Sequence, residues 1–110
     1  MRQPRDTLHG TLDLLVLRSL ADGEAYHGTA IADRIAEASA DALSVEEGSL
    51  YPALHRMEEA GWVTSKWNAS ENNRRARYYR ITPKGRRQLA RATRRWTTHV
   101  DAVLRVLKMA

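Results

Sequence analysis

Hydrophobic and polar residues follow two different periods along this chain, and Gly and Pro residues separate the segments that carry them. Residues 11–20 are apolar on nearly every side of a helix, and Gly23 follows them as a stop. A helix of this kind needs cover on several sides, and a partner subunit is one source of that cover. Residues 28–38 carry a shorter stripe of Ile and Ala, which predicts a second helix resting on the first.

A third helix is predicted for residues 47–60, because apolar side chains recur there at offsets of three and four and Gly61 follows as a stop. The expected inner face consists of Leu50, Ala53, Leu54 and Met57. The opposite face, which we expect to point outward, carries Gly48, Tyr51, Pro52, His55 and Glu59, with Ser49 and Arg56 on one flank. Ser44 and Glu47 have the spacing of a capping box at the helix start, whereas Pro52 fits only in a first helical turn.

The last third of the chain predicts a hairpin and a long helix. Residues 62–67 and 76–81 alternate and are rich in β-branched and aromatic residues, so they predict two strands joined by the polar segment 68–75. Thr82 followed by Pro83 is typical of an N-cap and a first helical position, which opens a helix running to about residue 107. Apolar residues recur along it at alternating threes and fours, like a heptad seam: Leu89, Trp96, Val100, Val103 and Leu107.

This order of elements predicts a mostly α-helical fold with a two-stranded β wing, a winged helix-turn-helix followed by a long C-terminal helix. The chain has 110 residues, of which 43% are hydrophobic, so it can build one core and leaves no room for a second domain. In a winged helix the third helix enters the major groove with its N-terminal residues near base edges, while the hairpin reaches the adjacent backbone or the minor groove.

Charge is distributed unevenly along the chain, whose formal net charge is +5. Residues 1–73 hold six basic and twelve acidic side chains, whereas residues 74–110 hold twelve basic and one acidic. The strongly basic segment 74–110 favours a polyanionic partner. Nucleic acid is the first expectation, and an anionic membrane is the second. The chain has no cysteine, which excludes disulfides and thiolate zinc sites, and no apolar run approaches a membrane span. We therefore expect a cytoplasmic protein without a signal peptide and without a membrane partner.

The expected hairpin tip concentrates the positive charge in Arg74, Arg75 and Arg77, with Asn72 and Asn73 beside them. A solvated charge run is the simpler interpretation. Like charges on a short tip repel one another, however, and gain nothing until a polyanion such as double-stranded DNA binds. We therefore expect the wing to bind phosphates, and the outward side chains of residues 47–60 to reach base edges, although an exposed Tyr or His is also ordinary surface.

Four segments carry a resemblance to a known family: LHGTLDLLVLRSL (8–20), HGTAIADRI (27–35), VEEGSLYPALHRMEEAGWV (45–63) and SENNRRARYYRITPKGRRQL (70–89). Over residues 8–107 the chain resembles the PadR family of transcriptional regulators, in the subgroup with a single terminal helix. The resemblance implies a winged-helix homodimer that represses transcription and is often released by a small aromatic effector. It places residues 49–52 at the start of the recognition helix and residues 73–75 in the wing. Thr29 departs from the aromatic residue that many relatives carry there.

The expected division of the chain is a DNA-binding domain at residues 1–81 and a dimerisation helix at residues 82–110, packed on the same unit. Apolar residues of the first and last helices form the expected dimer interface: Leu12, Leu15, Leu89, Trp96, Val100, Val103 and Leu107. Trp96 either packs in this interface or borders an effector pocket together with Val100. In members of the resembling family that sense drugs, a tryptophan of the terminal helix can flank a flat ligand.

Nothing in the sequence predicts an enzyme, a cofactor or a metal site. Paired carboxylates, histidine clusters and phosphate-binding glycines are not brought together by the expected elements. The four histidines lie on four different expected elements, at His9, His27, His55 and His99. Glu58 and Glu59 stand near the end of a helix, where the dipole disfavours acids, and the sequence offers no reason for them. The alternative function is a winged-helix module that binds an acidic protein surface, which the wing arginines would fit equally well.

Overall fold

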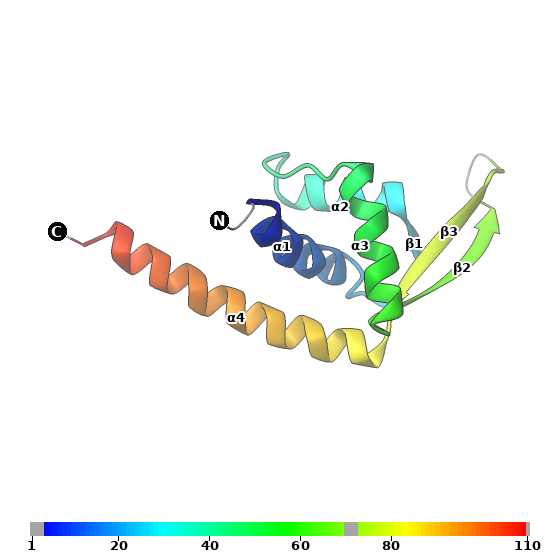
Figure 1. The fold of residues 1–110 in the computed structure, drawn as a ribbon. Coiled ribbons are helices and arrows are strands. Elements are labelled where there is room, and N and C mark those ends of the chain that lie inside the picture. The colour runs from blue at the N-terminus through cyan, green and yellow to red at the C-terminus, as the bar shows by residue number, and fades with distance from the viewer. Residues whose placement is uncertain (1–3, 70–72, 110) are drawn as a thin grey trace.

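The computed structural model describes residues 4–69 and 73–109, and it arranges them as helices around one end of a small sheet (Figure 1). The elements are α1 (Pro4–Ser19), β1 (Tyr26–His27), α2 (Gly28–Ala38), α3 (Glu47–Glu59), β2 (Val63–Ala69), β3 (Arg75–Ile81) and α4 (Pro83–Leu107). The predicted fold class is confirmed: the chain is mostly helical, with a β wing and a long last helix. The prediction started the first helix late, since α1 begins at Pro4 and ends at Ser19.

The sheet has three antiparallel strands in the order β1-β3-β2, rather than the two strands that we predicted. The missing strand is β1, whose two residues are too short to show any alternation in sequence. Its Tyr26 pairs with Tyr79 of β3, and Val63 of β2 pairs with Ile81. The base of the wing hairpin is therefore held in the sheet, while the strands continue outward beyond it.

The core lies where the three N-terminal helices meet the base of the sheet. It is formed by Leu12, Val16, Leu17, Leu20, Ile31, Ile35, Leu50, Ala53, Leu54, Met57, Val63, Tyr79 and Ile81. Every apolar residue expected on the inner face of α3 belongs to this core, which confirms the predicted orientation of that helix. Burial of an aliphatic side chain contributes about 1.5–3 kcal/mol, so this face fixes how α3 is rotated.

The start of α3 differs from the expectation in two ways. The N-cap is Glu46, which makes no side-chain capping hydrogen bond, so the capping box at Ser44 was wrong. Pro52 lies inside the helix, not in its first turn. The missing N–H of Pro52 removes one backbone hydrogen bond, the one that would reach Gly48, and the buried side chains that follow hold the helix together despite this loss.

The junction between the sheet and α4 is closely packed. Thr82 caps α4 as predicted, because its hydroxyl oxygen accepts a hydrogen bond from the Gly85 amide at 3.0 Å and donates to the Gly61 carbonyl at 2.6 Å. A Cβ on Gly85 would lie 2.1 Å from the Trp62 carbonyl oxygen, so only glycine permits this approach. From here α4 packs along α1 and then extends past it, which gives the molecule its 58 Å length (Figure 1).

Candidate nucleic-acid interface

The outward face of α3 presents the side chains that the sequence assigned to it. Tyr51 is 41% exposed, Pro52 and His55 are exposed, and Ser49 is half-buried. His55 Nε2 lies 3.5 Å from a carboxylate oxygen of Glu59, one turn further along the helix. The face therefore offers a hydroxyl, an imidazole and an aromatic ring to a partner, while the apolar side of the helix is fully used by the core.

The Tyr51 side chain lies against the first residue of α2. A Cβ added to Gly28 would lie 2.6 Å from the Tyr51 hydroxyl oxygen and 2.7 Å from two carbon atoms of its ring. The Tyr51 ring therefore lies directly against the backbone of α2. His27, the preceding residue, caps α2 through Nδ1, which accepts a hydrogen bond from the Ala30 amide at 3.2 Å. The His-Gly pair is thus structural: it starts α2 and leaves room for Tyr51.

Arg56 lies on the flank of α3 and faces α1. Its guanidinium donates to a carboxylate oxygen of Asp13 at 2.7 Å. The flank position agrees with the sequence pattern, and this ion pair orients the guanidinium toward α1. A half-exposed pair of this kind contributes about 0–1 kcal/mol to stability, so its main effect is on where the guanidinium lies.

Glu58, for which the sequence offered no role, connects α3 to the wing. Its carboxylate accepts a hydrogen bond from the Ser65 hydroxyl at 2.7 Å and contacts the Arg77 guanidinium at 3.4 Å. Arg77 Nε also donates to the Ser65 hydroxyl oxygen at 2.7 Å. Arg77, which the sequence assigns to phosphate binding, thus also links the wing to α3.

The outer part of the wing carries exposed cations and one exposed aromatic ring. Asn73, Arg74 and Arg75 are exposed, and Asn73 has a positive φ of 58°, which suits a residue of a tight turn. Asn72 lies outside the described residues. The guanidinium carbons of Arg75 and Arg77 lie over the Trp67 ring, 5.3 Å and 5.6 Å from its centroid. The sequence reasoning missed Trp67, although strand alternation could have placed it on the face of these arginines.

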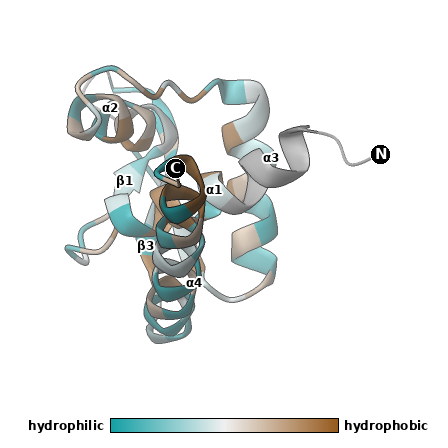
Figure 2. Cartoon of the chain, turned by 90° about the vertical axis from the view of Figure 1, so that its left-hand side faces the viewer, coloured by the Kyte–Doolittle hydropathy of each residue, from teal (hydrophilic) through white to brown (hydrophobic). Residues whose placement is uncertain are grey.

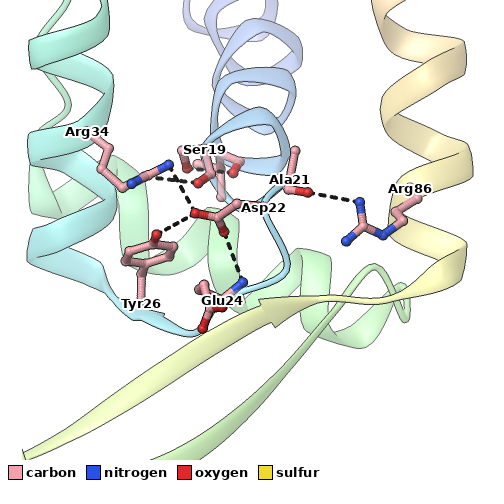
Figure 3. A network of polar contacts seen from close by, with 8 residues as sticks. Ser19, Ala21, Asp22, Glu24, Tyr26, Arg34 and Arg86 are labelled. Carbon is pink, nitrogen blue, oxygen red and sulfur yellow. Dashed lines mark hydrogen bonds and ion pairs between the residues drawn. The ribbon is translucent and has the colours of Figure 1, made fainter.

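A polar network ties the turn after α1 to α2 and α4 (Figure 3). The Asp22 carboxylate accepts hydrogen bonds from the Tyr26 hydroxyl and the Glu24 amide, and it lies 3.5 Å from the Arg34 guanidinium. The Tyr26 hydrogen bond is the largest cause that lowers the pKa of Asp22, and the same bond raises the pKa of Tyr26. Arg86 of α4 donates to the Ala21 carbonyl at 2.9 Å.

The residues expected at a dimer interface divide into two groups. Leu12 is only 4% exposed in the chain's own core, and Leu15 and Leu89 are partly buried against that core. Leu12 is therefore already covered within one chain, which corrects its assignment to an interface. On the outer part of α4, Trp96, Val103 and Leu107 are exposed and Val100 is half-buried. Figure 2 shows the apolar residues at this end of α4.

Two hollows on the described surface are relevant to the expected effector pocket. A small one of about 220 Å³ lies between α1 and α4, and its lining residues are Leu14, Ala92, Arg95, Trp96 and His99. Trp96 borders this hollow, which lies within one chain, whereas the expected effector pocket lies between subunits. Val100 is not part of its lining. The larger one, about 770 Å³, lies between α1, α2 and the loop that follows α2. In the part of the chain that the structure describes, no cluster of three metal-ligating side chains occurs, and no helix is long and apolar enough to cross a membrane.

Comparison with known proteins gives consistent results in sequence and in structure. A family model described as the transcriptional regulator PadR-like family matches residues 16–91. The transcriptional regulator Rv3488 of Mycobacterium tuberculosis is 35% identical over 85 residues, which cover 77% of this chain and 75% of that protein. A transcriptional regulator from Clostridium thermocellum has a TM-score of 0.83 at 27% identity, over 94% of this chain and 99% of that one. A PadR-family regulator from Eggerthella lenta has a TM-score of 0.78 at 30% identity, over 94% and 88%.

Proposed function

The chain belongs to the PadR-like family of transcriptional regulators, which are not enzymes, and on that premise we propose that it is a homodimeric repressor that binds an operator in double-stranded DNA. One observation carries the proposal. The exposed face of α3 with Tyr51 and the arginine-rich wing are linked by the contact of Glu58 with Arg77, so one nucleic acid can reach both elements.

Within this surface, the residues divide by the part of DNA that they suit. Ser49, Tyr51, Pro52 and His55 project from α3, the helix that enters the major groove in winged-helix proteins, and we assign them to base edges. Asn73, Arg74 and Arg75 are assigned to phosphates. Arg56 and Arg77 have intramolecular partners, but each guanidinium carries five N–H donors, so both can also donate to phosphate oxygens.

The outer part of α4 supports the proposed dimer. Its exposed apolar residues are Trp96, Val103, Leu104, Val106 and Leu107, on a helix whose other positions are largely charged or polar. Because this segment extends past α1, one chain cannot cover it, and a second copy with the same seam can. Such a dimer matches a palindromic operator if its two α3 helices lie about 34 Å apart, which is one turn of DNA.

We further propose that a flat aromatic effector binds beside Trp96 and releases the operator. The hollow between α1 and α4 supports this, because both helices would set the spacing of the two α3 helices in the dimer. A ligand that holds the α3 helices at another spacing must bind the dimer with that spacing more tightly than the dimer that fits the operator. A preference of about 1.4 kcal/mol weakens operator binding tenfold. Release of bound operator by planar aromatic compounds, with quenching of Trp96 fluorescence, tests this part separately.

The DNA-binding proposal is tested with a duplex selected from a random-sequence pool and with an unselected duplex. Arg75→Ala should weaken binding to both, and it should reduce the log-log salt slope by about 0.9 for each phosphate that the variant no longer neutralises. Tyr51→Ala should mainly weaken binding to the selected duplex. Arg94→Ala, which removes an exposed charge from α4, is the control for net charge. A wild-type protein that enriches no sequence from the pool refutes operator recognition and favours a protein partner.

A further inference from the structure

Trp67 is the most exposed aromatic side chain among the large hydrophobic residues of the described chain, with 56% of its surface accessible. An apolar ring in the middle of a strand normally packs on neighbouring side chains. Trp67 instead lies under the guanidinium groups of Arg75 and Arg77 and remains open to solvent on the rest of its surface. These cation–π contacts explain where the two guanidinium groups lie, but much of the apolar surface of the Trp67 ring remains exposed to solvent.

The register of the hairpin shows which way the Trp67 ring faces. Side chains on a strand alternate, and Val63, Ser65 and Trp67 therefore share one face of β2. Val63 is in the core, and Ser65 bonds Glu58 in the last turn of α3. Trp67 thus continues the face that turns toward α3. Figure 1 shows α3 and the hairpin diverging beyond the base of the wing. Trp67 lies two residues further along β2 than Ser65, on the same face, so we expect it on the side of the wing that turns toward α3.

We propose that Trp67 contacts DNA directly, with its indole packed against deoxyribose of the backbone strand that passes between α3 and the wing. This inference rests on the proposed function. Charge complementarity selects this occupant, because the ring is apolar and the two groups over it are guanidiniums, which bind phosphate oxygens through paired N–H groups. An apolar ring with adjacent cations matches the alternation of sugars and phosphates along a strand.

Arg77 gives this arrangement its stiffness. The same guanidinium contacts Glu58 of α3, the Ser65 hydroxyl and the Trp67 ring, so a continuous set of contacts runs from the recognition helix to the outer wing. DNA binding then requires little reordering of Trp67, and the contact costs less conformational entropy than a mobile side chain would. Trp67 acts on the sugar, which every sequence presents, so its contribution is independent of base sequence.

The first experiment compares Trp67→Ala and Trp67→Phe with Asn68→Ala, which removes an exposed side chain from the opposite face of β2. Binding to selected and unselected duplexes is measured by fluorescence anisotropy at several salt concentrations. Trp67→Ala should weaken both about tenfold, within the range known for aromatic contacts with nucleotides, and should leave the salt slope unchanged. Trp67→Phe should keep most of the affinity, and Asn68→Ala should keep all of it. A weaker binding accompanied by a lower salt slope would mean that Trp67 only holds Arg75 and Arg77, which overturns the proposal.

A second measurement tests the contact without truncating Trp67. The chain has three tryptophans, so Trp62→Phe with Trp96→Phe leaves Trp67 as the single reporter. Adding duplex should protect Trp67 from acrylamide quenching, and unchanged quenching at saturating DNA overturns the proposal. If the wild-type protein binds no duplex at all, the proposed function fails. If it binds while Trp67→Ala binds equally well, only the inference about Trp67 fails.

Discussion

Gly28→Ala offers a test of how α2 positions the recognition helix. The new Cβ would lie 2.6 Å from the Tyr51 hydroxyl oxygen, whereas non-bonded heavy atoms pack at about 3.5–4.0 Å. The Tyr51 ring must therefore move by about 1 Å, which is the difference between these distances. The ring can move, because Tyr51 lies on an exposed face and the atoms nearest the new Cβ all belong to its side chain.

The expected result is a loss of recognition without a loss of folding. Gly28 is the first residue of α2 and has no positive φ, so Ala fits its backbone conformation. Replacing Gly by Ala at such a position stabilises a protein by about 0.4–1 kcal/mol by restricting the unfolded chain, which offsets the cost of moving the ring. The thermal midpoint should therefore change little. Displacing a residue that reads bases should cost about 1–3 kcal/mol of discrimination, so affinity for the selected duplex should fall about tenfold or more. Affinity for unselected DNA should stay near the wild-type value.

The assay is a double-mutant cycle of Gly28→Ala and Tyr51→Ala, measured as the ratio of selected to unselected binding. In the Tyr51→Ala background, Gly28→Ala should have no further effect, because the ring with which it collides is absent. Gly48→Ala is the matched control, since a Cβ there meets no atom within 4 Å. The reasoning is refuted if Gly28→Ala reduces the ratio equally in both backgrounds, or if it unfolds the protein.

Three further predictions concern stability and assembly. Val100→Asp should convert the proposed dimer to monomer in light scattering, because it places a charge in the seam; an unchanged dimer contradicts the seam. Gly85→Ala should lower the thermal midpoint strongly, since its Cβ would lie 2.1 Å from the Trp62 carbonyl oxygen, which is backbone and cannot rotate away; a wild-type midpoint would contradict this. The Tyr26 hydroxyl lowers the pKa of Asp22, so its carboxylate stabilises the folded state above its ordinary pKa of 3.8, and this contribution is lost as the pH falls below that value. The thermal midpoint of Asp22→Asn should lie below that of wild type at neutral pH and approach it in acid, and a gap that is constant with pH refutes the assignment.

Short sequence patterns were sufficient to predict where several helices begin or end. The stripe of Ile and Ala predicted α2 at residues 28–38, and Thr82 with Pro83 predicted the start of α4; both agree with the structure. The inner face of α3 was also predictable, because apolar offsets of three and four reflect the helix itself. These features depend on backbone geometry and capping, which neighbours in sequence decide.

Contacts between distant residues were decided only by the tertiary structure. β1 exists because β3 offers a partner to two residues that show no pattern of their own. Arg56 donates a hydrogen bond to Asp13, 43 positions away, and Arg77 donates one to Glu58, 19 positions away, so neighbours in sequence could not identify either partner. Local sequence sets which side chains leave the core, but their partners depend on how helices and strands pack, and packing is a property of the whole chain.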